Sequence, residues 1–198
     1  MIENSVHIRY KDKPVLLDRA LQDIQGGLLS RLKWLNYAFG RVYKLVEYKP
    51  EGFKFTYPAV YNGQGEYLSM VPNDNLGNFS WFEIYDPQKV IQVAPGSSRY
   101  SFNGAIVFWY NLSSIYTDED VLHTEEIKSE IIKALTSPGL TTSGSRVTVT
   151  EIYEQFENIY KGYVISGDRL ADGDRQFLMY PYAGIRVEFN LLTKELCV

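Results

Sequence analysis

The segment SFNGAIVFWYNLSSIY, residues 101–116, constrains the fold most, because its apolar residues fall on both faces of an extended chain. One face would carry Ala105, Val107 and Trp109, and the other would carry Ile106, Phe108 and Tyr110. A strand that is apolar on both faces lies inside a sheet and is covered on both sides. The segment therefore predicts a central strand, with either helices on both faces or a second sheet or subunit on one.

A second strand is predicted at YPYAGIRVEFNLL, residues 180–192. Here the apolar residues alternate with Arg186, Glu188 and Asn190, which is the period of a strand with one dry and one polar face. Two interpretations of Arg186 and Glu188 remain open at this point. They are either an ordinary solvated pair or a contact to another protein.

Residues 12–46 have the pattern of a long amphipathic helix. Asp12 can cap it, Pro14 suits its first turn, and apolar residues recur at spacings of three and four: Leu17, Leu21, Ile24, Leu28, Leu32, Leu35, Phe39 and Val42. Gly26 and Gly27 predict a kink or a break in the middle, because glycine weakens a helix interior. The apolar stripe either packs on the chain's own sheet or docks on a neighbouring molecule.

Two further helices are predicted, at residues 118–136 and 150–161, each preceded by a capping-box spacing. Short strands separated by turn-forming residues fill residues 50–100. The predicted fold is therefore α+β: a mixed or antiparallel β-sheet packed by two C-terminal helices, with a long kinked N-terminal helical segment. We expect a single domain over residues 1–198, with the helical segment at 1–49 and the α+β body at 50–198.

Composition excludes several classes of protein. The net charge of −4 gives no basic footprint for nucleic-acid binding, and Cys197 is the only cysteine, so no disulfide within the chain is expected. The N-terminus is too polar for a signal peptide, and no run of about 18 apolar residues predicts a membrane span. We expect a soluble chain that is not exported and does not bind a membrane.

Metal and cofactor sites are not predicted. His7 and His123 are far apart in the sequence, and zinc sites need three or four matched ligands. Asp168, Asp172 and Asp174 lie close together beside a glycine, but they lack the spacing of a calcium loop and are expected to form a solvated turn. No phosphate-binding loop or nucleophile elbow is present, so we predict that the protein is not an enzyme.

The C-terminal half of the chain resembles a known class of virion protein. The motifs VTEIYEQFENIYKGYV and YPYAGIRVEFNLL, within residues 147–192, are similar to those of small neck proteins of tailed bacteriophages, the tail-terminator and head–tail connector class. The long N-terminal segment and the aromatic 50–100 region indicate an elaborated version, similar to a ring protein of a crAss-like short-tailed phage.

The resemblance implies a structural protein that forms a ring of six or twelve copies in the virion neck or tail. Its partners would be other neck, portal or tail proteins, and double-stranded DNA would pass through without sequence-specific binding. The chain would be made in the cytoplasm of the bacterial host and would need no cofactor. The implied subunit-interface residues are Arg186, Glu188, Tyr180 and Tyr182.

Two other functions stay open. The chain has 16 Tyr, 10 Phe and 3 Trp, and exposed aromatic residues within 79–85 or 57–67 would suit a non-catalytic carbohydrate-binding module. Alternatively, Glu47 and Lys49 form an acid-x-Lys pair of the kind that some metal-dependent nucleases carry on a strand. The first alternative predicts a ligand-responsive monomer, and the second predicts magnesium-dependent cleavage.

Overall fold

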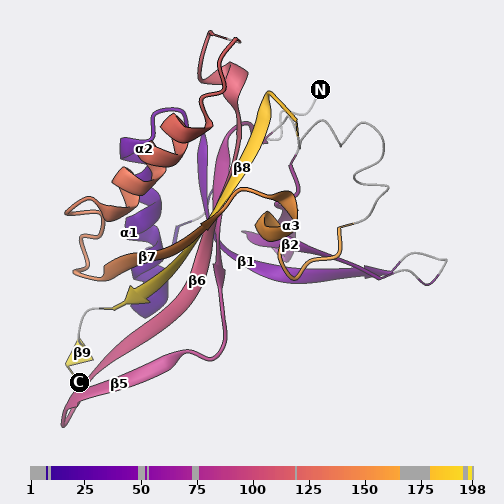
Figure 1. Cartoon of the computed structure of the whole chain (residues 1–198). Coiled ribbons are helices and arrows are strands. Elements are labelled where there is room, and N and C mark those ends of the chain that lie inside the picture. The colour runs from indigo at the N-terminus through magenta and orange to yellow at the C-terminus, as the bar shows by residue number, and fades with distance from the viewer. Residues whose placement is uncertain are drawn as a thin grey trace.

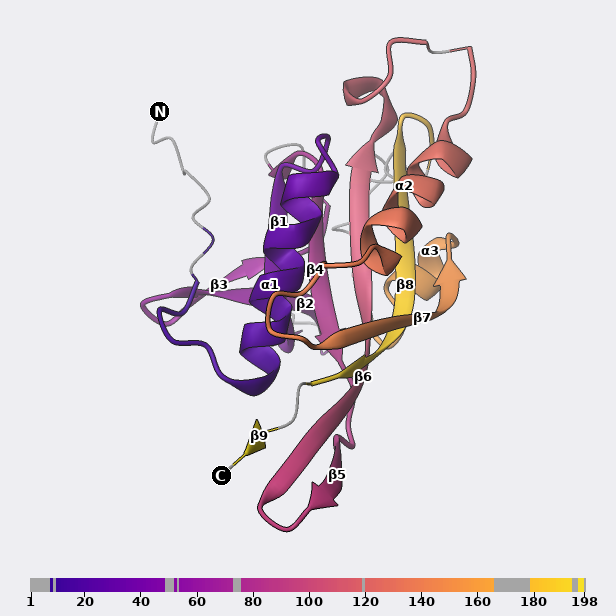
Figure 2. The same cartoon turned by 90° about the vertical axis from the view of Figure 1, so that its left-hand side faces the viewer.

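The computed structural model describes residues 8, 10–48, 52, 54–72, 76–118, 120–165, 179–193 and 196–197; Figures 1 and 2 show the fold from two sides. The helices are α1 (Leu16–Arg31), α2 (Thr124–Thr136) and the one-turn α3 (Phe156–Ile159), with a 3-10 turn, η2, at Leu112–Ser114. The strands are β1 (Tyr37–Tyr48), β2 (Lys54–Gly63), β3 (Glu66–Ser69), β4 (Phe79–Ile84), β5 (Lys89–Ala94), β6 (Ser97–Asn111), β7 (Arg146–Tyr153), β8 (Tyr182–Leu192) and β9 (Leu196–Cys197).

These strands form one mixed sheet in the order β3-β2-β1-β4-β6-β8-β7. Strands β1 and β4 are parallel, and the other pairs are antiparallel. Strands β5 and β9 pair with the first residues of β6. Strand β6 confirms the central strand predicted within residues 101–116, since Ile106, Phe108, Val107 and Trp109 are all buried.

Each face of the sheet carries its own hydrophobic core. Helices α1 and α2 cover one face, where they pack on Phe82, Ile106, Phe108 and Val187. The opposite face is covered by α3 and the turn that follows it, in a cluster that includes Trp81, Trp109 and Tyr160. Figure 1 shows α1 and α2 to one side of β6 and β8, with α3 on the other side.

The predicted fold class is wrong, because the protein is mostly β-sheet and lacks a long kinked N-terminal helix. Helix α1 ends at Arg31, and residues 37–48, assigned to the helical segment 1–49, form β1 instead. Apolar spacing alone misled the prediction, since Leu35, Phe39 and Val42 extend the helical stripe by coincidence. The segment YAFGRVYKLVEY is rich in aromatic and β-branched residues, which favour a strand.

Gly26 and Gly27 do not interrupt α1, which is continuous from Leu16 to Arg31. Gly27 instead allows a close approach: a β-carbon there would lie 2.7 Å from Leu140 Cδ1 and 2.9 Å from the Leu140 carbonyl oxygen. At Gly26 a β-carbon would meet nothing within 4 Å. Only the second glycine therefore has a packing reason to be small.

The two C-terminal helices are shorter than predicted. Helix α2 begins at Thr124 rather than at 118. Most of the helix predicted at 150–161 is strand β7, and only Phe156–Ile159 is helical. The Thr148–Glu151 spacing that resembled a capping box lies inside β7. Pairing of β7 with β8 along Arg146–Tyr153 supplies the long-range contacts that override this local signal.

Candidate functional site

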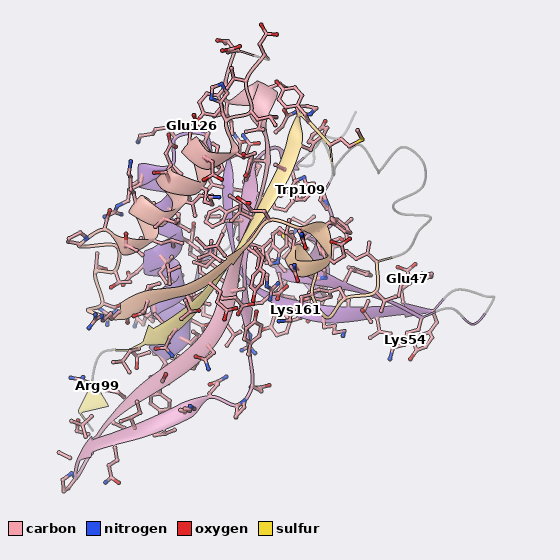
Figure 3. All side chains as sticks on the ribbon, in the orientation of Figure 1. Glu47, Lys54, Arg99, Trp109, Glu126 and Lys161 are labelled. Atoms are coloured by element: carbon pink, nitrogen blue, oxygen red, sulfur yellow. The ribbon has the colours of Figure 1, made fainter. Side chains whose placement is uncertain are left out.

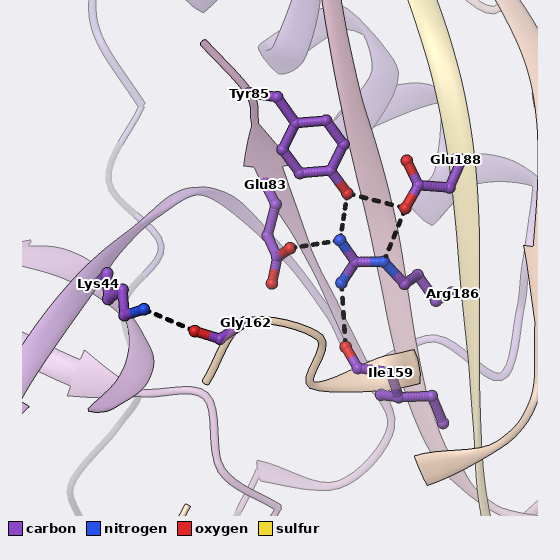
Figure 4. A network of polar contacts seen from close by, with 7 residues as sticks. All are labelled: Lys44, Glu83, Tyr85, Ile159, Gly162, Arg186 and Glu188. Atoms are coloured by element: carbon purple, nitrogen blue, oxygen red, sulfur yellow. Dashed lines mark hydrogen bonds and ion pairs between the residues drawn. The ribbon is translucent and has the colours of Figure 1, made fainter. Parts of the chain in front are cut away.

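The predicted interface residue Arg186 lies at the centre of a buried polar network on β8 (Figure 4). Its Nη2 donates to Glu83 Oε2 at 2.6 Å and to the Tyr85 hydroxyl. Its Nε donates to Glu188 Oε1 at 3.0 Å, and its Nη1 donates to the Ile159 carbonyl at 3.0 Å. All three guanidinium nitrogens are therefore used within the chain.

The strand register explains how these groups meet. Arg186 lies opposite Val107 of β6, while Glu83 and Glu188 lie opposite Ala105 from either side. Strands two places apart in a sheet are separated by roughly 9.5 Å, a gap that a long arginine side chain can bridge. Because Ala105 has only a methyl group, the guanidinium can cross β6 above it and reach the Glu83 carboxylate.

Burial sets the ionisation of this network. Burial raises the pKa of Glu83, and the positive charge and hydrogen bond of Arg186 oppose that rise. Burial also lowers the pKa of Arg186, but the Glu83 carboxylate outweighs it and the net pKa is raised. Burial likewise raises the pKa of Tyr85, which stays protonated at neutral pH. The network joins β4, β8 and α3, and its role in this fold is structural.

The Arg186 side chain is 1% exposed, so neither interpretation of this residue, an ordinary solvated charge or a contact to another subunit, fits the folded chain. Glu188 is also engaged within the chain, where it accepts from Arg186 and from the Tyr85 hydroxyl. The alternation of apolar and polar residues along β8 correctly separated the two faces of the strand. It does not indicate which part of the chain covers the polar face. The α3 segment, which supplies the Ile159 carbonyl, covers it.

The other two predicted interface residues lie nearer the surface. Tyr180 is 41% exposed, just before β8. Tyr182 is partly buried and lines a cavity of about 370 Å³ together with Trp109 and Phe156. The assignment of Tyr180 and Tyr182 to a subunit interface stays a prediction.

An exposed apolar surface projects from one end of the sheet. Strand β5 pairs with residues 97–101 of β6, and all six of its residues are exposed. We call residues 89–101 the β5–β6 arm. Its apolar residues Val90, Ile91 and Val93 are 63%, 44% and 48% exposed. Figures 1 and 2 show the arm extending past the helices, and Figure 3 shows its side chains standing out from the ribbon around labelled Arg99.

A second exposed surface is aromatic and lies on β1, β2 and β3. Tyr43, Tyr61 and Tyr67 are each between 45% and 49% exposed. Tyr67 contacts both of the others edge-on, with ring centroids 6.1 Å from Tyr43 and 5.4 Å from Tyr61. By contrast, β4 is buried along Phe79–Glu83, so the aromatic residues proposed for ligand binding within 79–85 offer little surface. Only the candidates within 57–67 remain accessible.

The structure describes no arrangement typical of a metal enzyme. Within its described residues, no three His, Cys, Asp or Glu side chains lie close enough together to hold a metal ion. His123 stacks on Tyr116 with ring centroids 4.0 Å apart. Lys49 of the acid-x-Lys pair, His7, and the acidic residues Asp168, Asp172 and Asp174 lie outside the described residues. No helix in the described part of the chain is long and apolar enough to cross a membrane.

The sequence prediction missed the arm and Tyr43 as surface features. The segment VIQVA was identified as a strand, but nothing local shows that a strand will have no layer above or below it. A usable signal was present in the flanking turns, since DPQ and APGSS isolate KVIQVA as a short hairpin strand. Tyr43 was hidden because residues 37–48 were assigned to a helix.

Comparison with known proteins identifies no relative: no protein-family model matches the chain, and no curated protein sequence matches it.

Proposed function

We propose that this protein is a structural subunit that assembles with copies of itself into a closed ring, and that it has no catalytic role. The observation that carries the proposal is the β5–β6 arm. Strand β5 is the outer strand of this arm, since among the described strands it pairs only with β6, and an exposed apolar edge strand invites pairing with another chain. Val90, Ile91 and Val93 would lose their exposure to water if the arm packed against a neighbour.

The position of the arm favours head-to-tail assembly. It leaves the body at the first residues of β6, whereas Tyr182 and its cavity lie at the far end of the same strand, since Tyr182 pairs with Asn111. An arm that docks on a different surface of its neighbour makes a heterologous contact, and such contacts close into rings when the rotation permits. Six or twelve copies is the number that the resemblance of residues 147–192 implies.

The same resemblance supports the virion neck or tail as the place of assembly, with portal, neck or tail proteins as neighbours. The net charge of −4 suits a ring through which DNA passes, because few phosphate contacts mean weak retention of the duplex.

Light scattering over a concentration series tests the proposal. The wild-type protein is expected to have the mass of a closed ring, and the triple variant Val90→Thr, Ile91→Thr and Val93→Thr is expected to be a monomer. Threonine keeps the strand preference of these positions and removes apolar surface. Val46→Thr is the matched control, because Val46 is 46% exposed on β1 and lies outside the arm.

Circular dichroism must show that all three proteins are folded. A wild-type monomer at every concentration contradicts the proposal. An arm variant that assembles as well as the wild type also contradicts it, because the arm would then be unnecessary for assembly.

A further inference from the structure

A pocket lies between α1 and the first three strands. A β-bulge in β1 directs two of its lining residues toward it. The register of β1 against β4 shifts between Ala38 and Arg41. Ala38 pairs with Ser80 and Arg41 pairs with Phe82, so Ala38 and Arg41 point to the same face although they are three residues apart. The bulge therefore turns Arg41 and Tyr43 toward the face that α1 covers.

The resulting cavity measures about 390 Å³, within the range of small-molecule sites. We call it the tyrosine pocket. Helix α1 and the segment before it contribute one wall, and β1 and β2 contribute the other. The lining residues that matter here are Tyr10, Gln22, Gln25, Arg41, Tyr43 and Tyr61.

The aromatic side of the pocket is held in place before any ligand arrives. The Tyr61 hydroxyl accepts a hydrogen bond from the Gly65 backbone N–H at 3.2 Å. Tyr67 contacts the rings of both Tyr43 and Tyr61. The Arg41 guanidinium lies 5.7 Å from the centroid of the Tyr43 ring. These contacts restrict the rings while leaving nearly half of each tyrosine exposed, so binding would cost little side-chain ordering.

The opposite side of the pocket is polar. Gln22 Nε2 donates to the Lys11 carbonyl at 3.3 Å, which leaves Gln22 Oε1 buried and without a hydrogen-bond partner among the described residues. Gln25 Nε2 donates to the Ala38 carbonyl at 2.7 Å. Lys11 forms an ion pair with Asp18, so this lysine is already neutralised. An amide oxygen without a partner would be stabilised by a ligand hydroxyl once the Gln22 side chain turns toward the cavity that it lines.

We infer that the tyrosine pocket binds a carbohydrate. A pyranose ring has an apolar C–H face and a rim of hydroxyl groups. The strand wall offers the rings of Tyr43 and Tyr61 together with the Arg41 guanidinium, and the wall from α1 and the segment before it offers amide and carboxylate groups. The polar wall is too rich in hydrogen-bonding groups for a lipid chain. A phosphate-bearing ligand would have to lie beside the Asp18 carboxylate, and Lys11 is already paired there.

The inference does not depend on ring assembly, because the β5–β6 arm contributes no residue to the lining of this pocket. A glycan site on β1–β3 would serve a monomer or a ring equally. Failure of one proposal therefore leaves the other standing.

Saturation-transfer NMR on the full chain tests the inference. The probes are glucose, galactose, mannose, N-acetylglucosamine, maltose and cellobiose, each followed by a titration to obtain Kd. At least one sugar is expected to bind, and Tyr61→Ala and Gln22→Leu are each expected to weaken it at least tenfold. Tyr48→Ala is the matched control, since Tyr48 is a 70% exposed tyrosine of β1 that does not line the pocket.

Three outcomes overturn the inference. None of the six sugars shows saturation transfer, or the two pocket variants bind as tightly as Tyr48→Ala, or adenosine monophosphate displaces the bound sugar and binds more tightly. Thermal unfolding of each variant, monitored by circular dichroism, separates loss of the site from loss of the fold.

Discussion

Arg186 of β8 and Glu83 of β4 form an ion pair across the intervening strand β6, with Nη2 and Oε2 2.6 Å apart. Both side chains are almost fully buried, at 1% and 7% exposure. A buried pair of this kind contributes little net stability compared with an apolar pair, but removal of one partner leaves a charge without compensation. Removal of Arg186 alone and removal of both charges should therefore have different effects on stability.

Arg186→Met is expected to destabilise the protein by about 3–5 kcal/mol, because Glu83 would stay buried without its counter-ion. The double variant Arg186→Met with Glu83→Gln is expected to recover part of this loss, since no charge is then left in the core. Urea unfolding followed by circular dichroism measures all three free energies of unfolding. Equal stability of the single and double variants would show that the carboxylate is not what destabilises the fold.

The same variant predicts a pH dependence. Burial raises the pKa of Glu83 above its ordinary value of 4.5, so the fold favours the protonated acid. The contribution of the protonated Glu83 side chain to the free energy of unfolding is fully present below pH 4.5. It is lost as the pH rises through the folded-state pKa. Without Arg186 that pKa rises further, so Arg186→Met should lose stability more steeply than the wild type as the pH rises above 4.5. Urea unfolding at several pH values measures this slope. The double variant with Glu83→Gln should not show the extra pH dependence. If the extra pH dependence persists, a group other than Glu83 causes it.

Asp23 predicts the opposite sign of pH dependence. Burial raises the pKa of Asp23, but hydrogen bonds from Ser143 and Thr142 outweigh it and hold the net pKa below 3.8. Asp23 Oδ2 accepts from the Ser143 N–H at 2.7 Å, and Oδ1 accepts from the Thr142 hydroxyl at 2.8 Å. The stability that these bonds give is therefore present above pH 3.8 and is lost as the pH falls through the folded-state pKa.

Asp23→Asn is expected to cost about 1 kcal/mol at pH 7, a value reduced for the solvent exposure of the site. The difference from the wild type should be smaller at a pH below 3.8, because the wild-type carboxylate becomes protonated as the pH falls through its folded-state pKa. Guanidinium unfolding at both pH values measures it. A difference that grows on acidification would show that Asp23 does not stabilise the 141–145 turn through its charge.

The adjacent glycines of α1 give a matched pair of substitutions. Gly26→Ala is expected to stabilise by about 0.5–1 kcal/mol, because alanine favours a helix and a β-carbon there meets nothing within 4 Å. Gly27→Ala gains the same helix preference but would bring its β-carbon to 2.9 Å from the Leu140 carbonyl oxygen. We expect a net loss of about 1–2 kcal/mol from this overpacking. Thermal unfolding of both variants measures the pair, and equal shifts would show that Leu140 moves aside freely.

Local sequence patterns predicted some of this fold, and the rest depends on contacts between distant residues. The apolar residues on both faces of 105–110 located the central strand, because a strand that is buried on both faces has apolar residues at successive positions. The apolar stripe from Leu17 to Leu28 likewise marked α1. The same stripe could not reveal that α1 ends at Arg31, since the signal that overrides it is the pairing of β1 with β2 and β4.

The candidate sites were harder to predict for the same reason. Nothing near Arg186 in the sequence indicates that Glu83, 103 residues away, lies beside it. The bulge between Ala38 and Arg41 is visible only in the pairing of β1 with β4, and it decides which side of the sheet Tyr43 faces. The exposure of Val90 and Ile91 depends on how far the helices extend over the sheet. The sequence of β5 itself does not indicate this.

Strand β6 also has a mechanical consequence. It begins in the arm and continues through the body, where eleven successive residues from Ser101 to Asn111 pair with β8 while residues 104–109 pair with β4. Antiparallel hydrogen bonds run perpendicular to the strands, so a pull on the arm along β6 loads many of them in shear at once. A force applied at the arm would therefore be shared by the whole centre of the sheet, instead of opening it one bond at a time.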